Sequence, residues 1–293
     1  MTETEVKSDL LLGEDSRRQF KENIFGGMLA RQLYKRGYVL LPLEVFKLQG
    51  RARNNFENLC QAYESRLRAS GAPIPSGKRR SDLLARQMGT PPAEAYSIVE
   101  CLSRTSLVEG DVCEFGVAQG EISALIASEI LETKKHFHLF DSFEGLPPPT
   151  AKDTLKDDIF SLGSIEAYTG RMANPETLVR GRLNAVRFPE SRVHVHRGFF
   201  EDLVAARAGF PSRVSFAYVD FDFYAPIKLA LGFLDEVTAA GSMVVVDDYD
   251  YFSTGVKAAV DEFVDERRSA GREYELVVPD TVYGHFAILI RNN

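Results

Sequence analysis

The spacing of apolar residues changes along the chain near residue 105. Before that point they recur at intervals of three and four, as between residues 56 and 67, so that they would share one helical face. This pattern predicts helices within residues 21–70. It predicts a further helix from Pro91-Pro92 toward Ser106, because proline suits a first helical turn.

Other N-terminal segments do not follow helical spacing. Residues 1–20 are highly charged and are expected to fray. Residues 71–77 contain two prolines and two glycines, which end the helical pattern. The basic run Lys78-Arg79-Arg80 is interpreted as a solvated loop rather than a binding patch.

From Gly110 onward, short apolar runs alternate with helix-length intervals, which is typical of an α/β domain with a mostly parallel sheet. The seven runs are Val112–Val117, Phe137–Phe140, Val193–His196, Val214–Val219, Met243–Val246, Tyr274–Val278 and His285–Ile290. The last two are too close together for a crossover helix, so they are expected to form an antiparallel hairpin. We therefore expect a helical N-terminal region, residues 1–105, followed by an α/β domain, residues 106–293.

Composition narrows the class of protein. The 293 residues include 35 basic and 42 acidic side chains, and the resulting net charge of -7 argues against a nucleic-acid partner. No apolar run approaches the roughly 18–20 residues that cross a bilayer, and the polar, acidic start does not resemble a signal peptide. The three cysteines favour neither a disulfide framework nor a zinc site. We expect a soluble, cytoplasmic protein without a membrane or nucleic-acid partner.

In an open α/β sheet, ligands bind at the carboxyl ends of the strands. The first strand is followed by Gly116 and Gly120, in a pattern that matches neither the dinucleotide fingerprint nor a phosphate loop. The turn is either only a tight turn or a site for a zwitterionic or nucleoside ligand. Asp141 ends the second strand, where a carboxylate can bind both hydroxyls of a ribose or, alternatively, cap the next helix or turn.

Three more acids follow the fourth and fifth strands, which should be neighbours in the sheet. They are Asp220, Asp247 and Asp248. Converging carboxylates repel one another unless a cation lies between them, and oxygen ligands favour magnesium, manganese or calcium. The alternative is that these acids only cap the following helices. Asp222 is expected to face the opposite side of the strand from Asp220.

Four of the five histidines occupy alternate positions in the second and third strands. His196 lies next to the strand end and is the one retained as a weak site candidate, while His285 starts the last strand. No catalytic Ser-His-Asp or Cys-His arrangement follows from the spacing.

Together these motifs resemble the macrocin O-methyltransferase family, which methylates sugar hydroxyls in macrolide and related natural-product (antibiotic) biosynthesis. The resemblance runs from about residue 90 to the C-terminus. It rests on Glu114-Phe-Gly-Val-x-x-Gly, Asp141-Ser-Phe-Glu-Gly-Leu-Pro, Asp220-x-Asp-x-Tyr and Val246-Asp-Asp-Tyr. The second of these strings is the most specific.

The resemblance implies a class I S-adenosylmethionine-dependent methyltransferase fold, with strand order 3-2-1-4-5-7-6 and strand 7 antiparallel. It implies a magnesium (or manganese) site at Asp220, Asp247 and Asp248. The cofactor-binding residues that it implies are Glu114, Gly116, Gly120, Ser123, Asp141, Ser142, Gly198, Phe199 and Asp220. It also implies that the helical N-terminal region makes oligomer contacts and covers the site, so a homo-oligomer (dimer or tetramer) is expected.

The sequence departs from the pattern at the catalytic base. The insert after the second strand has no histidine, and Phe223 stands where catechol-type enzymes carry lysine. The base stays open among Asp158, Tyr168, His196 and Tyr251. The expected reaction is methyl transfer to a hydroxyl of a small glycosylated acceptor. Alternatives are a catechol or phenol acceptor, a metal-dependent glycosyltransferase and a non-catalytic cofactor-binding homologue.

Overall fold

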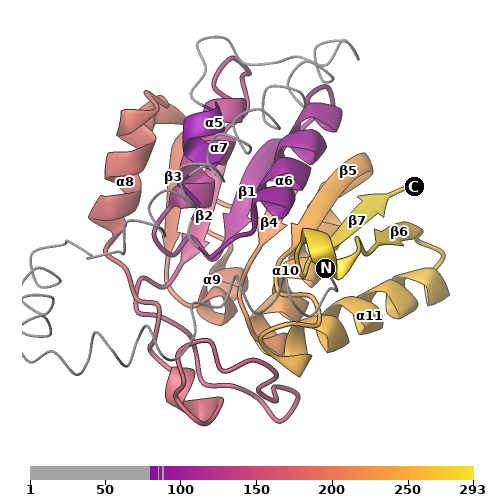
Figure 1. The fold of residues 1–293 in the computed structure, drawn as a ribbon. Coiled ribbons are helices and arrows are strands. Elements are labelled where there is room, and N and C mark those ends of the chain that lie inside the picture. Colours follow the sequence, from indigo (N-terminus) through magenta and orange to yellow (C-terminus); the bar gives the residue numbers. More distant parts are fainter. Residues whose placement is uncertain (1–79, 85, 88) are drawn as a thin grey trace, which may run out of the picture. The chain divides into compact units, whose positions relative to one another are not determined.

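A computed structural model describes residues 80–84, 86–87 and 89–293 of the chain (Figure 1). The expectations for residues 1–20, for the helices within 21–70 and for Lys78-Arg79 lie outside these residues. Among the described residues, no helix is long and apolar enough to cross a membrane.

A seven-stranded sheet forms the centre of the described fold. Its strands are β1 (Asp111–Phe115), β2 (Phe137–Asp141), β3 (Val193–Arg197), β4 (Val214–Val219), β5 (Thr238–Val246), β6 (Tyr274–Val277) and β7 (Ala287–Arg291). The strand order is β3-β2-β1-β4-β5-β7-β6. Strands β1 to β5 pair in parallel, while β7 is antiparallel to both β5 and β6. The predicted α/β class, strand order and terminal hairpin are all confirmed.

Helices cover both faces of the sheet (Figure 1). One face packs against α5 (Arg80–Leu84), α6 (Pro92–Arg104), α7 (Glu121–Glu129) and α8 (Glu176–Ala185). The other packs against α9 (Phe200–Ala206), α10 (Tyr224–Val237) and α11 (Thr254–Ser269). Short 3₁₀ turns lie at Glu166–Tyr168, Glu190–Arg192 and Thr281–Tyr283.

The strand sequences explain this layering. In β1, Val112 belongs to the core under α6 and α7, whereas the next residue, Cys113, and Phe115 belong to the core under α9 to α11. Because successive side chains point to opposite faces, a strand covered on both sides must be apolar at consecutive positions. The continuous apolar runs are therefore explained by burial of the sheet between two layers of helices.

One basic residue is placed differently from the sequence prediction. Arg80 begins α5, is only 3% exposed, and forms an ion pair with Glu129 at the end of α7. The interpretation of Arg80 as part of a solvated loop is therefore wrong. Its partner, Glu129, is distant in the sequence, so the local charge pattern around Arg80 could not predict the ion pair.

A long insert, residues 142–192, connects β2 to β3. It is attached to the rest of the domain by Asp153, which is buried and whose carboxyl oxygen accepts a hydrogen bond of 2.8 Å from the Tyr224 backbone N–H at the start of α10. An isolated β-bridge joins Leu155 to Ser253 before α11. The insert is thus fixed against the carboxyl-end side of β4 and β5.

Four histidines form a cluster between β2 and β3. His136 Nδ1 lies 2.8 Å from His194 Nε2, and His138 Nδ1 lies 3.0 Å from His196 Nε2. The His196 ring also stacks on Phe140. Burial, together with the neighbouring His138 and His194, lowers the pKa of His196 to about 4. The cluster therefore favours the uncharged form of His196.

Acidification is expected to destabilise the fold through this cluster. The unfolded chain titrates His196 near pH 6.5, so between about pH 6.5 and 4 it binds more protons than the native state. Protonation of His196 in the unfolded chain should therefore lower the free energy of unfolding by on the order of 1 kcal/mol for each pH unit of acidification across that window. Denaturant unfolding at pH 7.5, 6 and 5 should show that the free energy of unfolding falls less steeply with decreasing pH in His196→Gln than in the wild type. Equal slopes in the two proteins would contradict the assignment.

Candidate active site

The turn after β1 brings the backbone of two neighbouring strand ends together at Gly116. Its N–H donates to Phe140 O at 2.9 Å, and Asp220 N–H donates to Phe115 O at 2.7 Å. Gly116 has φ +83°, and a Cβ placed there would lie 1.8 Å from Asp220 O. Only glycine fits, because any side chain would collide with backbone rather than with a movable group.

Asp141 organises the same turn from the end of β2. Its Oδ2 accepts hydrogen bonds from Val117 N–H at 2.7 Å and Ala118 N–H at 3.1 Å, and its Oδ1 accepts one from Phe143 N–H at 2.6 Å. Gly120 follows in the left-handed region, with φ +80°, and α7 begins at the next residue. The carboxylate therefore holds the glycine turn against the end of the sheet.

The segments around Ser142 and Gly198 lie on either side of Asp141. The Ser142 hydroxyl donates to Gly145 O at 3.0 Å and so shapes the turn that follows β2. Gly198 N–H donates to Asp141 O at 3.0 Å, and Phe199 is the N-cap of α9. Gly198 and Phe199 therefore lie beside the end of β2, although β3 separates them from it in the chain.

Two adjacent buried side chains below the turn, Glu114 and Ser123, each have an oxygen atom without a geometric hydrogen bond. Glu114 on β1 and Ser123 on α7 are almost completely buried, and neither Glu114 Oε2 nor Ser123 Oγ has a hydrogen-bond partner. Burial raises the pKa of Glu114 well above its usual range. Buried polar atoms normally pair, so these two are suited to a polar ligand at the turn.

The three acids at the ends of β4 and β5, Asp220, Asp247 and Asp248, are called the acidic rim below. Burial and the charges of Asp247 and Asp248 raise the pKa of Asp220 well above its usual range. Burial and the charge of Asp247 do the same for Asp248. The structure therefore places the three carboxyl groups within electrostatic reach of one another, as parallel neighbouring strands require.

Hydrogen bonds hold Asp247 in place. Its Oδ2 accepts a hydrogen bond of 2.6 Å from the Tyr218 hydroxyl, and its Oδ1 accepts one of 2.7 Å from the Asp248 N–H. Burial raises the pKa of Asp247, while the Tyr218 hydrogen bond, the adjacent Glu94 carboxyl group and, more weakly, the charge of His285 oppose the shift. A carboxylate with two fixed donors keeps its remaining lone pairs in a defined direction.

Two further carboxyl groups join the rim. Asp222 is buried with φ +61°, and its side chain lies within hydrogen-bonding reach of Asp248. The expectation that Asp222 faces away from Asp220 is wrong, since residues two apart in a strand share a face, and Asp222 in any case follows the end of β4 at Val219. Glu94, on α6, is also buried, and burial and the charge of Asp247 raise its pKa well above its usual range. Sequence reasoning missed Glu94, because it precedes the sheet.

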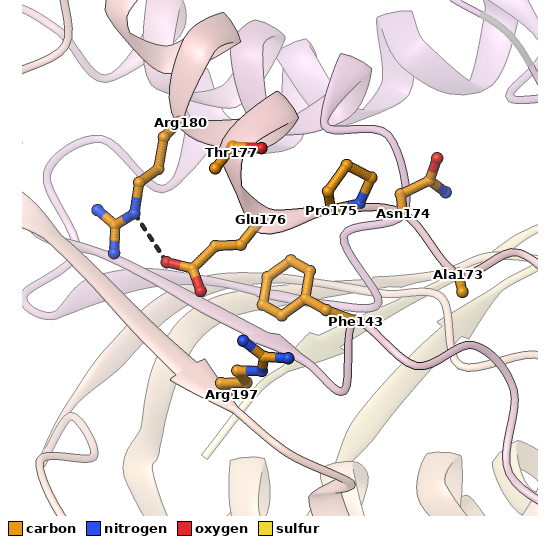
Figure 2. A pocket seen from close by; sticks show the side chains of 8 residues that line it. All are labelled: Phe143, Ala173, Asn174, Pro175, Glu176, Thr177, Arg180 and Arg197. Atoms are coloured by element: carbon orange, nitrogen blue, oxygen red, sulfur yellow. Dashed lines mark hydrogen bonds and ion pairs between the residues drawn. The ribbon is translucent and has the colours of Figure 1, made fainter.

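Beside Asp141, a cavity of about 590 Å³ opens between the ends of β2 and β3 and the first turn of α8 (Figure 2). Figure 2 shows the Phe143 ring projecting into it, with Arg197 on the β3 side and Pro175 at the start of α8. Glu176 pairs with Arg180 on the helix side, at 2.7 Å. The volume is within the range of small-molecule pockets. Phe143 and Arg197 were not among the predicted site residues, although Phe143 belongs to the string Asp141-Ser-Phe-Glu-Gly-Leu-Pro that carries the resemblance.

The candidate bases occupy different surroundings. The Tyr168 hydroxyl donates to Asp158 Oδ1 at 2.6 Å inside the insert, and Tyr168 is completely buried. His196 belongs to the histidine cluster. Tyr251 follows β5 beside the rim, and its ring stacks on His285 with ring centroids 4.6 Å apart. A hydrogen bond to Asp157, together with burial, raises the pKa of Tyr251 to about 12, which suits a donor rather than a base.

A seven-stranded sheet of this order, with a glycine turn after β1 and an acid ending β2, defines a class I S-adenosylmethionine-dependent methyltransferase. The model of the macrocin-O-methyltransferase (TylF) family matches residues 45–272, and the chain belongs to that family. It is therefore an S-adenosylmethionine-dependent O-methyltransferase.

Solved structures share the fold at low sequence identity. The O-methyltransferase NovP is 21% identical with a TM-score of 0.56, and the match covers 69% of this chain and 81% of NovP. The calicheamicin methyltransferase CalS11 is 20% identical with a TM-score of 0.55, and the match covers 87% of this chain and 95% of CalS11. An apo structure of CalS11, described as a TDP-rhamnose 3'-O-methyltransferase, is 17% identical with a TM-score of 0.50. The match covers 87% of this chain and 97% of that chain. No curated protein sequence matches the chain.

Proposed function

We propose that this enzyme methylates a sugar hydroxyl of a natural product, or of a precursor of one, with the help of a divalent cation held at the acidic rim. The observation that carries the proposal is the position of the rim beside the glycine turn. Family membership and the similarity to CalS11, a TDP-rhamnose 3'-O-methyltransferase, support a sugar acceptor. The cation is proposed to be Mg²⁺ or Mn²⁺.

For the cofactor, the fit rests on the glycine turn and on the unpartnered atoms below it. Glu114, Ser123 and the backbone at Gly116 and Gly120 are proposed to hold the methionine part, with Asp220 nearby. Asp141 is proposed to bind the ribose. Ser142, Gly198 and Phe199, with the cavity at Phe143, are proposed to enclose the adenine. The bound cofactor supplies a methyl group already activated as a sulfonium.

For the cation, the fit rests on the donor set. Carboxylate oxygens without histidine or cysteine partners suit a hard divalent ion, and the mutual repulsion recorded in the raised pKa values of Asp220 and Asp248 is what such an ion relieves. Within the described residues, no three acidic, histidine or cysteine side chains already form a metal-ion geometry. A cation coordinated to the acceptor would lower the pKa of its hydroxyl and fix its direction.

This assignment predicts separate calorimetric signals for cofactor and cation. Chelator-treated protein should bind S-adenosylmethionine and, in a separate titration, Mg²⁺, and Asp247→Asn should lose the Mg²⁺ signal. Asp250→Asn is the matched control, since Asp250 is exposed and pairs with Lys156. Cofactor binding without any Mg²⁺ signal in the wild type would remove the cation from the proposal.

The acceptor class is tested by offering TDP-linked and macrolide-linked deoxysugars beside catechols and phenols. Product mass identifies a transferred methyl group and distinguishes it from a transferred sugar. Methylated catechol with no methylated sugar would overturn the sugar assignment.

The proposal includes a homo-oligomer, dimer or tetramer, in the cytoplasm, with residues 1–105 making oligomer contacts and covering the site. Its support is the resemblance of the motifs and the net charge of -7. Light scattering on the full chain measures the oligomeric state, and a monomer would contradict this part.

A further inference from the structure

Glu94 is a buried carboxyl group without a hydrogen-bond donor. It lies in the first turn of α6 and is 0% exposed, and neither of its side-chain oxygens has a hydrogen-bond partner. Burying a carboxylate without a partner costs several kcal/mol. A proton shared with a neighbouring acid, or a positive charge from outside the chain, must therefore offset that cost in the working enzyme.

Glu94 cannot play the usual structural role of an acid at the third position of a helix. A glutamate at the third helical position commonly reaches back to the backbone N–H of the N-cap residue. Here the N-cap is Pro91, which has no N–H to donate. The positive end of the helix still favours a negative charge in its first turn, so the helix stabilises the ionised form without satisfying the side-chain oxygens.

The groups that face Glu94 are the carboxyl groups of the rim. Asp247 lies close enough to share a proton with it, and Asp220 and Asp248 are within electrostatic reach. Tyr218 and the Asp248 N–H already occupy Asp247 with donated hydrogen bonds, which favour its anionic form. Two anions that face each other in a buried site attract whatever positive charge can enter between them.

We propose that Glu94 is a fourth carboxylate of the cation site, contributed by α6 from outside the strand ends. This inference rests on the cation proposed above for the rim. It assigns to the cation a second effect, which is to fasten α6 to the ends of β4 and β5. Without the cation, Glu94 and Asp247 must share a proton or repel each other, and Glu94 would help to hold the cation when it is bound.

The test uses the full chain, freed of metal with chelator, and Mn²⁺ as the probe. Binding is followed by calorimetry and by the electron paramagnetic resonance signal of free Mn²⁺, and thermal unfolding is recorded with and without Mn²⁺. Glu94→Gln should bind Mn²⁺ about tenfold more weakly or worse. Its metal-free unfolding temperature should not fall below that of the wild type, since the substitution removes a buried charge.

Two variants complete the design. Glu100→Gln makes the same change on the same helix and should bind Mn²⁺ like the wild type. Glu94→Asp keeps the charge on a shorter side chain and should retain more Mn²⁺ affinity than Glu94→Gln. A pattern of weak binding in Glu94→Gln, partial rescue in Glu94→Asp and no change in Glu100→Gln supports the inference.

Other outcomes overturn it. Wild-type Mn²⁺ affinity in folded Glu94→Gln would show that the two carboxyl groups merely share a proton. If Glu94→Gln did not fold, wild-type affinity combined with a lower metal-free unfolding temperature in Glu94→Asp would show a structural role. A wild-type protein that binds no Mn²⁺ would remove the proposed cation itself, and that failure is recognised before any variant is measured.

Discussion

Replacing Asp220 by asparagine is expected to reduce methyl transfer by more than about a hundredfold. Even residues that only orient a metal ligand change activity about 10–100-fold, and Asp220 is proposed to be a ligand. The substitution keeps the backbone bond from Asp220 N–H to Phe115 O and removes only the negative charge. Steady-state turnover on an acceptor that the wild type methylates is the measurement.

The same variant should be at least as stable as the wild type when metal is absent. The pKa of Asp220 is raised above its unfolded value, so its ionised form destabilises the native state as the pH rises above about 4. Asparagine removes that cost at pH 7. Retained turnover would contradict the proposed cation mechanism. A metal-free unfolding temperature below that of the wild type would contradict the electrostatic description of the rim.

Gly116→Ala is expected to abolish cofactor binding and to destabilise the fold by about 3 kcal/mol or more. The added Cβ would lie 1.8 Å from Asp220 O and 2.8 Å from the carbonyl carbon, in a residue with φ +83°. Backbone must move to accept it, and the movement would displace the glycine turn and the acidic rim together. Calorimetry with S-adenosylmethionine and denaturant unfolding measure the two effects.

The Gly170→Ala variant distinguishes the effect of the steric collision from the effect of the left-handed backbone conformation. Gly170 also has a positive φ, +73°, but a Cβ there would meet nothing within 4 Å. That variant should lose only about 1 kcal/mol, which is the cost of placing alanine in the left-handed region. Similar losses of stability in the two variants would show that the contact with Asp220 does not matter.

The sheet was predictable because its signals are local. Continuous apolar runs such as Val214–Val219 arise from burial on both faces, and the short link before the last run excludes a crossover helix. The rim was also predictable, since Asp220 and the Asp247-Asp248 pair follow neighbouring parallel strands directly. The resemblance to the family added the strand order, which local pattern does not contain.

The features that were missed depend on contacts between distant segments or on geometry beyond a strand end. Asp222 was assigned to the wrong side, since residues two apart in a strand share a face and the strand period no longer applies beyond Val219. Arg80 was taken as solvated because its partner, Glu129, lies 49 residues further along the chain. Glu94 looks like any first-turn glutamate until the fold brings α6 over the rim.

The insert between β2 and β3 leaves the sheet after Asp141, at the carboxyl end of β2, and returns at Val193, at the amino end of β3, where Val193 is the register partner of Phe137. Its attachments at Asp153 and Leu155 are hydrogen bonds to backbone, which many sequences can satisfy. The stretch between Asp141 and α8 can be exchanged for one of another length, whereas α8 is kept because Val179 and Leu183 pack into the core. Evolution could therefore alter acceptor choice by replacing this one stretch, and chimeras joined after Asp141 and before α8 offer the same route to protein engineers.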